Sequence, residues 1–267
     1  LHYPLRRQRQ MCIRDSSTDM AESQDQRTEG GAQALALSLQ GLHAWYGESH
    51  VLHGVDLDVR RGEVVTLLGR NGAGRTSTLR AIMGLTGTRK GSIKIAGEEV
   101  SHLPTHRIAH RGVGYCPEER GIFASLSCEE NLMLPPTLKS SGKGMSVAEI
   151  YEMFPNLAER RHSQGTRLSG GEQQMLAVAR ILRTGANLLL LDEISEGLAP
   201  VIVQALARMI VMLKARGYTV VMVEQNFRFA APLADRFYVM EHGRIVERFG
   251  AAELQQKMPV LTELLGV

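Results

Sequence analysis

Segment 69–77, GRNGAGRTS, places three glycines between an apolar run and a stretch rich in helix formers. Glycines let successive backbone N–H groups curl around an anion, and the N-terminus of a following helix adds partial positive charge. The segment matches the phosphate-loop consensus G-x-x-x-x-G-K-[ST], except that arginine occupies the lysine position. We predict a phosphate site here; a glycine-rich turn that binds nothing is the alternative. The contacts should come from Gly69, Arg70, Asn71, Gly72, Ala73, Gly74, Arg75, Thr76 and Ser77.

Two side chains of this segment have distinct tasks. Residue 75 must place positive charge on the β- and γ-phosphates, and Arg75 is charged at every physiological pH. Its guanidinium is bulkier than an ammonium group, so the replacement of lysine is not conservative in general. Thr76 can offer its hydroxyl to Mg²⁺. We expect the arginine to be accommodated and the loop to bind the Mg²⁺ complex of a nucleotide.

A pair of acids follows the apolar segment 188–191, LLLL. Asp192 and Glu193 stand where a buried parallel strand would end, and ligands of parallel α/β sheets gather at the carboxyl ends of strands. Asp192 can hold Mg²⁺ through water, and Glu193 can polarise an attacking water molecule. An acidic cap at a helix start is the alternative interpretation.

Segment 168–174, LSGGEQQ, opens a further predicted helix with a serine and two glycines, and a helix start of this kind can face a phosphate. Together with the two preceding motifs, it resembles the signature of ATP-binding-cassette (ABC) ATPases. In that family two cassettes close head to tail around two ATP molecules, so each signature contacts the nucleotide of the other subunit. The resemblance implies ATP and Mg²⁺ as cofactors. It assigns nucleotide contacts to Ser169, Gly170, Gly171 and Glu172.

The resemblance assigns roles to three further positions. Tyr46, in WYG, matches the aromatic residue that stacks on adenine; a core aromatic is the alternative. Glu118, in YCPEERGIF, replaces the usual glutamine that senses Mg²⁺ and γ-phosphate; an exposed loop acid is the alternative. Gln225, in VMVEQNF, replaces the switch histidine and cannot become cationic. The resemblance therefore implies Glu193 and Gln225 as catalytic residues, and Thr76, Glu118 and Asp192 as metal ligands.

These residues require a sheet that presents several strand ends at one edge. Segments 63–69, 187–192 and 218–224 are continuous apolar runs, as expected for strands buried on both faces of a parallel sheet. Helical patterns separate them, which indicates a βαβ plan. From Ala34 onward, alternating apolar and polar residues predict an antiparallel sheet. Segment 236–250 predicts a hairpin that turns at His242-Gly243, and an amphipathic helix follows it.

The predicted fold class is α/β: a P-loop ABC cassette with a mostly parallel core sheet, an N-terminal antiparallel β subdomain and a helical subdomain. Residues 34–267 should form the nucleotide-binding domain, with the helical subdomain at about 119–172 and a mobile loop in PPTLKSSGKG. Residues 1–33 are expected to be a disordered tail. Part of it is expected to be non-native, because RQRQMCIRDS resembles a translated adapter sequence, which would put the natural start at Met20.

Composition excludes several classes of protein. The 267 residues are 43% hydrophobic, enough for a sizeable core, and no apolar run approaches the ~20 residues of a membrane-spanning helix. A net charge of +3 without a dense basic stretch argues against a nucleic-acid partner. Cys12, Cys116 and Cys128 form no C-x-x-C pair, which suits a reducing compartment.

The segments LSGGEQQMLAVAR, LLLLDEISEGLAP, VEQNF and LADRFYVMEHGRIV narrow the resemblance to the ATP-binding subunit of bacterial branched-chain amino acid importers, the one with VEQN at the switch. It implies an ATP-hydrolysing subunit, peripheral on the cytoplasmic face of the inner membrane. Its partners would be a second cassette, identical or similar, two permease subunits and, through them, a periplasmic or extracellular solute-binding protein. Segment 121–126, with Phe123, would receive the permease; an apolar core patch is the alternative.

The sequence leaves three other functions open. The same machinery serves urea or short amides in similar proteins. A nucleotide-binding regulatory module without hydrolysis would explain why Arg75 and Gln225 depart from the pattern, although the retained Glu193 argues against it. A soluble cassette protein acting on DNA or ribosomes is disfavoured, because this sequence has neither a second cassette nor a long coiled-coil insertion.

Overall fold

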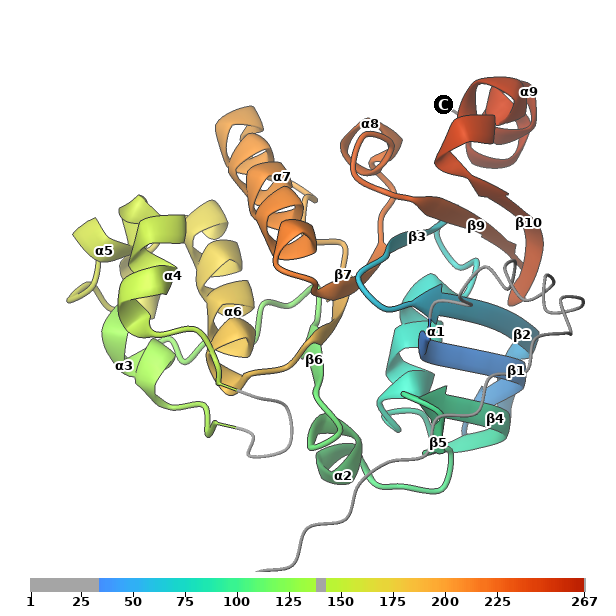
Figure 1. The fold of residues 1–267 in the computed structure, drawn as a ribbon, viewed down its shortest axis with the longest axis horizontal. Helices are drawn as coiled ribbons and strands as arrows, with labels where there is room; N and C mark the ends of the chain where they lie inside the picture. Colours follow the sequence, from blue (N-terminus) through green and yellow to red (C-terminus); the bar gives the residue numbers. More distant parts are fainter. Residues whose placement is uncertain (1–33, 138–142, 267) are drawn as a thin grey trace, which may run out of the picture. The chain divides into compact units, whose positions relative to one another are not determined.

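The computed structural model describes residues 34–137 and 143–266. The predicted tail, 1–33, and the centre of the predicted mobile loop, 138–142, lie outside these described residues. Two sheets organise the rest, an antiparallel one of order β2-β1-β4-β5 and a mostly parallel one of order β10-β9-β3-β8-β7-β6 (Figure 1). The predicted fold class is confirmed.

The antiparallel sheet comes from the N-terminal part of the described chain. Strand β1 (Leu35–Tyr46) pairs with β2 (Ser49–Arg60) on one side and with β4 (Thr88–Ile95) on the other. The short β5 (Glu98–Glu99) pairs with β4. Alternation of apolar and polar residues predicted this sheet, because one face packs on the core while the other is more exposed.

The larger sheet contains the three apolar runs as central strands. They are β3 (Val64–Gly69), β7 (Leu188–Asp192) and β8 (Thr219–Val223), and all their residues are buried. The sheet continues with β6 (Val113–Cys116), β9 (Arg236–Glu241) and β10 (Arg244–Gly250). Strands β9 and β10 form the predicted hairpin at His242-Gly243. The sequence indicated no strand at β6, because the run VGYC is too short to carry a pattern.

Two hydrophobic clusters lie on opposite faces of the larger sheet. Alternate residues of β3 divide between them: Val64 and Leu68 join the cluster of α6 (Gly170–Thr184) and α7 (Pro200–Ala215). Val65 and Leu67 join the cluster of α1 (Arg75–Ile82) and the antiparallel sheet. A strand that faces apolar side chains on both sides must itself be apolar throughout, which explains its continuous run.

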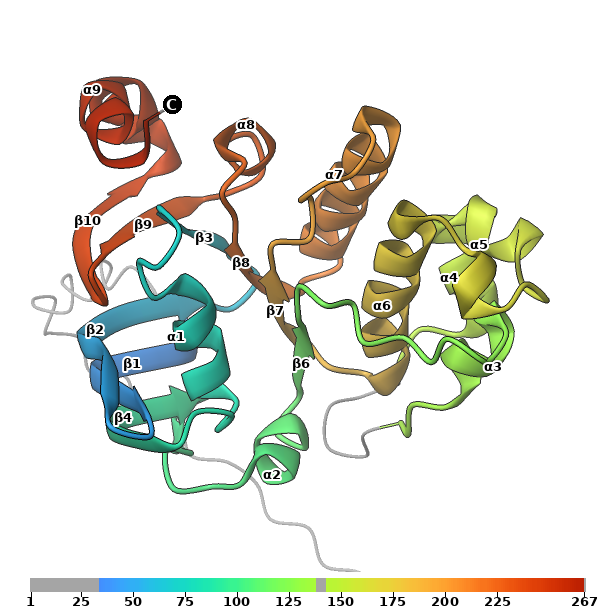
Figure 2. The same ribbon diagram turned by 180° about the vertical axis from the view of Figure 1, so that it is seen from behind.

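Short helices fill the predicted helical region. Figures 1 and 2 show α3 (Cys128–Met133), α4 (Val147–Met153) and α5 (Pro155–Glu159) gathered beside α6. Ser127 and Ser146 start α3 and α4 with capping boxes. The boundaries 119–172 of the helical subdomain stay a prediction. The other helices are α2 (Thr105–Ala109), α8 (Phe227–Ala230), the predicted C-terminal helix α9 (Leu254–Leu265) and two 3₁₀ turns, Gly165–Arg167 and Ala251–Glu253.

Parallel pairing brings four strand ends to one edge. Strands β3, β8, β7 and β6 are neighbours in this order and run in the same direction. The glycine-rich loop, the switch segment, the acidic pair and the loop with Glu118 follow their carboxyl ends. Segments far apart in the sequence therefore meet where α/β proteins bind ligands.

Candidate functional site

The glycine-rich loop joins β3 to α1 in a conformation that requires glycine. Gly72 and Gly74 have φ of 82° and 104°, in the left-handed region. A Cβ on Gly74 would lie 3.0 Å from Leu52 Cδ2 and 3.2 Å from Gly243 Cα. Helix α1 begins after Gly74 and carries no side-chain cap in the described structure. Its first backbone N–H groups are therefore available to an anion.

Arg75 lies under this loop, with only 4% of its surface exposed. Its Nη2 donates to Asn71 Oδ1 at 3.2 Å and to Glu193 Oε1 at 2.8 Å. Its Nη1 is buried without a partner among the described residues. A buried charged donor without a partner is unfavourable, so this nitrogen is available for an anionic ligand.

Asp192 is anchored from two sides. Thr76 Oγ1 donates to Asp192 Oδ1 at 2.9 Å, and the Tyr115 hydroxyl donates to Asp192 Oδ2 at 3.1 Å. Burial raises the pKa of Asp192 above its ordinary value, and the two hydrogen bonds work in the opposite direction. A cation at this point would relieve the cost of a buried carboxylate. Thr76 and Asp192 thus offer the oxygen ligands that Mg²⁺ prefers.

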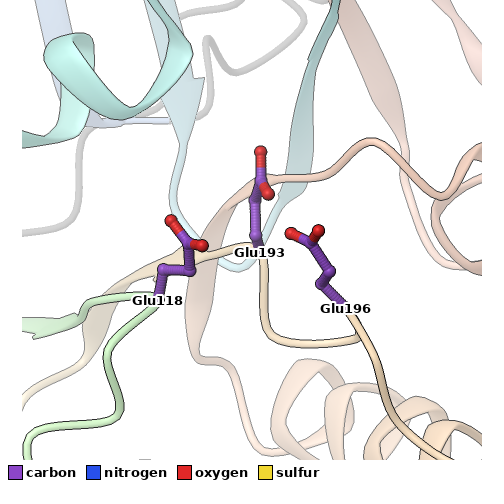
Figure 3. Close-up of side chains that lie close together, drawn as sticks. All are labelled: Glu118, Glu193 and Glu196. Atoms are coloured by element: carbon purple, nitrogen blue, oxygen red, sulfur yellow. The ribbon is translucent and has the colours of Figure 1, made fainter. Parts of the chain in front are cut away.

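Three glutamates converge beside this pair. One carboxylate oxygen from each of Glu118, Glu193 and Glu196 lies within 4.8 Å of the others, and Figure 3 shows the three side chains close together. Burial, first, and hydrogen bonding to Glu196 raise the pKa of Glu193 to about 7, while Arg75 opposes the shift. A group with a pKa near neutrality is suited to accept a proton.

The glycine-rich loop and the three glutamates line a cavity of about 620 Å³, which we call the main cavity. It contains the predicted residues from Asn71 to Ser77, together with Glu118 and Glu193. The rest of its lining comes from Glu196, from β2 and from the β9–β10 turn: His50, Val51, His53, His242 and Gly243. Tyr46 does not line it.

The switch segment lines two other cavities. Gln225 is exposed and shares a cavity of about 330 Å³ with Gly69 and Arg70. It shares another cavity of the same volume with Glu193. Glu224 before it is 1% exposed and accepts hydrogen bonds from Ser195 N at 3.2 Å and Ser195 Oγ at 2.7 Å. Burial raises the pKa of Glu224 to about 7.

The signature segment lies apart from these cavities. Ser169 is exposed and caps α6: Glu172 N donates to Ser169 Oγ at 3.3 Å, and Ser169 N donates to Glu172 Oε2 at 2.7 Å. A Cβ on Gly171 would lie 2.7 Å from Ile202 Cγ1, so the close approach of α7 requires glycine there. None of the residues 169–172 lines the main cavity.

Sequence reasoning missed the cavity-lining residues of β2 and of the β9–β10 turn, and it also missed Tyr115, Glu196 and Glu224. Tyr115 was overlooked because its strand was not assigned, and Glu196 because it sits in the same loop as the more obvious acidic pair. Glu224 ends an apolar run, which could have marked it as buried. In residues 34–137 and 143–266, every helix is too short or too polar to span a bilayer.

Comparison with known proteins bears on this arrangement. The ABC transporter family model matches residues 52–196. BraG of Pseudomonas aeruginosa, a high-affinity branched-chain amino acid transport ATP-binding protein, is 41% identical over 86% of this chain and 99% of its own length. LptB of Haemophilus influenzae, a lipopolysaccharide export system ATP-binding protein, is 36% identical over 79% of this chain and 88% of its own length.

A solved structure supports the fold. A dimeric ATP-binding cassette in a post-hydrolysis state, bound to ADP and phosphate, superposes with a TM-score of 0.70 at 22% identity. The match covers 80% of this chain and 98% of that one. The glycine-rich loop, the anchored Asp192 and the family match lead to one conclusion: the chain belongs to the ABC transporter family and is one of its ATP-hydrolysing cassettes.

Proposed function

We propose that this ATPase energises the import of branched-chain or related amino acids through a membrane permease. The observation that carries the hydrolytic part is that Arg75, Thr76 and Glu193 line the main cavity, where Arg75 pairs with Glu193 and Thr76 bonds Asp192. The substrate class rests on the 41% identity to BraG and on the VEQN switch segment. A cassette never holds the transported solute, so its own site leaves urea and short amides as alternatives.

The phosphates of ATP would lie over the N-terminus of α1. The free Nη1 of Arg75 would contact them with a charge-assisted hydrogen bond. Nη2 is already held by Asn71 and Glu193, so a bound phosphate competes with Glu193 for the guanidinium. In our proposal, Arg75 therefore supplies the positive charge that lysine supplies in the consensus motif.

Mg²⁺ would be held by Thr76 and Asp192, and by Glu118, which lines the same cavity as Thr76. When bound, it would supply positive charge to the phosphate oxygens. Glu193 would orient the attacking water and accept its proton, since its pKa of about 7 suits a general base. Gln225, in the cavity that it shares with Glu193, would donate a hydrogen bond to the γ-phosphate.

Cassettes of this family work as dimers with membrane permeases. For this chain we infer a second cassette, identical or similar, whose signature segment completes the main cavity. Phe123 is 50% exposed, and Arg180 lies over its ring at 4.8 Å. With exposed Met133 and Leu134, it offers an apolar surface for a permease helix, on the cytoplasmic face of the cell membrane. A solute-binding protein would deliver the substrate to the permease.

Dilution tests the shared site. ATP turnover per subunit should rise steeply with protein concentration, because hydrolysis needs the signature of a second chain. Turnover that stays constant while the protein remains monomeric would contradict the shared site.

Arg75→Lys tests the alternative of a regulatory module without hydrolysis. If the wild type assembled with its permease were inactive and Arg75→Lys restored hydrolysis, the regulatory module would be the correct function.

Uptake tests the substrate class. Cells lacking the gene should lose uptake of radiolabelled leucine, and the wild-type gene should restore it while Glu193→Gln should not. Labelled urea and a short amide serve as competing substrates. Restored uptake of urea without leucine would replace the amino acid assignment and leave the ATPase assignment intact.

A further inference from the structure

A buried contact joins the switch segment to the loop that follows β7. Glu224 comes directly before Gln225 and is 1% exposed. Its carboxyl group accepts hydrogen bonds from the backbone and the hydroxyl of Ser195, at 3.2 Å and 2.7 Å. Ser195 is itself buried and lies between Glu193 and Glu196, which Figure 3 shows on one loop. The Glu224–Ser195 contact therefore connects the segments that carry the two proposed catalytic residues.

Both segments continue neighbouring parallel strands. Asp192, the last residue of β7, pairs with Val223, the last residue of β8, and Glu193 N donates to Val223 O at 2.9 Å. Glu224 N donates to Leu67 O of β3 at 3.3 Å. The sheet thus fixes the backbone of Glu224, and its side chain reaches across to the loop after β7. Any movement of that loop relative to the switch segment must stretch the Glu224–Ser195 contact.

The loop after β7 bends sharply where it leaves the sheet. Glu193 has φ of 48°, in the left-handed region that residues with a Cβ rarely adopt. Such a conformation is unfavourable and persists only where surrounding contacts hold it. Ser195 is two residues further on, so its hydrogen bonds to Glu224 help to hold this bend. Loss of the contact should let Glu193 relax from its place beside Arg75.

Packing alone does not explain a carboxyl group at position 224. Burial raises the pKa of Glu224 to about 7, so this group lowers the stability of the folded chain above neutral pH. A buried apolar side chain has no such effect. Glu224 also lines both cavities that contain Gln225. Ionisable groups with strongly shifted pKa values cluster at functional sites, which favours a role in the reaction.

We propose that Glu224 is a positioning residue for hydrolysis: through Ser195 it fixes the placement of Gln225 relative to Glu193. The inference rests on the proposed roles of Gln225 at the γ-phosphate and of Glu193 at the attacking water. Both contacts must be met at once, so small errors in their relative placement lower the rate. The Glu224–Ser195 contact exists before any ligand arrives, and groups fixed in advance need no rearrangement during the reaction. Its loss should lower turnover and leave nucleotide affinity unchanged.

Steady-state hydrolysis of MgATP separates this role from a purely structural one. It is measured on the full chain at protein concentrations where turnover per subunit no longer rises, and it gives kcat and KM. Calorimetry gives the affinity for MgADP, and denaturant unfolding gives the stability. The variants are Ser195→Ala, Glu224→Ala and Glu224→Gln. Glu99→Ala is the matched control, because Glu99 accepts from the Ser92 hydroxyl and from Ile93 N on β4, outside the main cavity.

Ser195→Ala removes one hydrogen bond, so kcat should fall about fivefold while KM and MgADP affinity stay within about twofold of the wild type. Glu224→Ala removes both hydrogen bonds and should lower kcat by roughly tenfold or more. Glu224→Gln should stay near the wild type, because its amide can accept from Ser195 N and donate to Ser195 Oγ. Glu99→Ala should leave kcat unchanged. In the Glu224→Ala background, Ser195→Ala should cause no further loss, because the contact is already absent.

Unchanged kcat in Ser195→Ala, or the same loss of kcat in Glu99→Ala, would overturn the proposal. A loss confined to KM would overturn it too, as would additive losses in the double variant. If Glu224→Ala does not fold, Ser195→Ala and Glu224→Gln decide: the first should lower kcat and the second should retain it.

Failure of the underlying assignments has a different signature. Glu193→Gln and Gln225→Ala are measured in the same assay. If either keeps wild-type turnover, its proposed role is wrong and the proposal falls with it. If both are slow while Ser195→Ala is not, only the positioning role of Glu224 is wrong.

Discussion

Helices α1 and α6 both begin next to glycines, yet their N-termini differ in what they can bind. The start of α1 has no side-chain cap and lies in a cavity with the buried Arg75 beneath it. The start of α6 is closed by a capping box between Ser169 and Glu172, and its serine is exposed. The first offers free donors to an anion within one chain, whereas in our proposal the second contacts a nucleotide that another cassette holds.

Under the proposed shared site, this difference predicts different responses of the two helix starts to substitution. A ligand on α1 fills groups that have no other partner, such as Arg75 Nη1. A ligand on α6 must displace or add to hydrogen bonds that the helix already makes. Substitutions on the α1 side should therefore affect nucleotide binding in the isolated chain. Substitutions on the α6 side should affect only the assembled dimer.

The largest effect is expected for Glu193→Gln. Glutamine keeps the shape of the side chain but cannot accept the proton, so hydrolysis should fall by at least ~10²-fold while nucleotide binding remains. A steady-state ATPase assay and calorimetry measure the two quantities. Glu98→Gln is the control, because Glu98 of β5 is exposed, pairs with Arg111 and does not line the main cavity. Near-wild-type turnover of Glu193→Gln would mean that another group activates the water.

Arg75→Ala should come next. It removes a charge-assisted contact to the phosphates, so the affinity for MgADP should fall by ~2 kcal/mol, or about 30-fold, in the isolated chain. Arg75→Lys should keep measurable affinity, because it retains the positive charge. Calorimetry on both variants is the measurement. Undiminished affinity of Arg75→Ala would show that the backbone of the loop binds the phosphates without the guanidinium.

Ser169→Ala should separate the two regions. Hydrolysis by the assembled dimer should fall by roughly tenfold, the contribution of one hydrogen bond to a charged phosphate. Nucleotide affinity of the isolated chain should stay unchanged. Loss of the cap itself costs about 1 kcal/mol of stability. Ser146→Ala is a matched control, because it removes the same kind of capping box from α4. Equal loss of hydrolysis in both variants would attribute the effect to stability.

The smallest effect concerns Glu224, the buried acid between the switch and the loop after β7. Burial raises its pKa in the folded state to about 7, so the folded chain binds a proton that the unfolded chain releases. This contribution to stability is complete below the unfolded pKa near 4.5 and is lost as pH rises through about 7.

Denaturant unfolding measures this dependence. Between about pH 6 and about pH 8, the contribution of Glu224 to the free energy of unfolding should fall by about 1 kcal/mol. Glu224→Gln should remove that part of the pH dependence. Identical pH profiles of the wild type and Glu224→Gln would contradict the assignment.

Much of the region around the glycine-rich loop could be predicted from the sequence. Glycines at 69, 72 and 74 after an apolar run are typical of a phosphate loop, and Thr76, Asp192 and Glu193 meet as predicted. The partners of these residues could not be predicted in the same way. Tyr115 and Glu196 reach the site through strand pairing and a loop bend, and neither belongs to a recognisable pattern. Gln225, the signature residues and Tyr46 keep their assigned roles only as predictions.

The sequence by itself determined the family, the positions along the chain of the apolar runs that become strands, and the residue types of the glycine-rich loop. These are local properties, because turns, helix starts and buried strands impose their demands on neighbouring residues. Tertiary structure alone decided that Arg75 pairs with Glu193, and that His50 and His53 line the main cavity while Tyr46 does not. Such contacts join residues far apart in the chain through strand register and sheet order, and no local pattern encodes those distances.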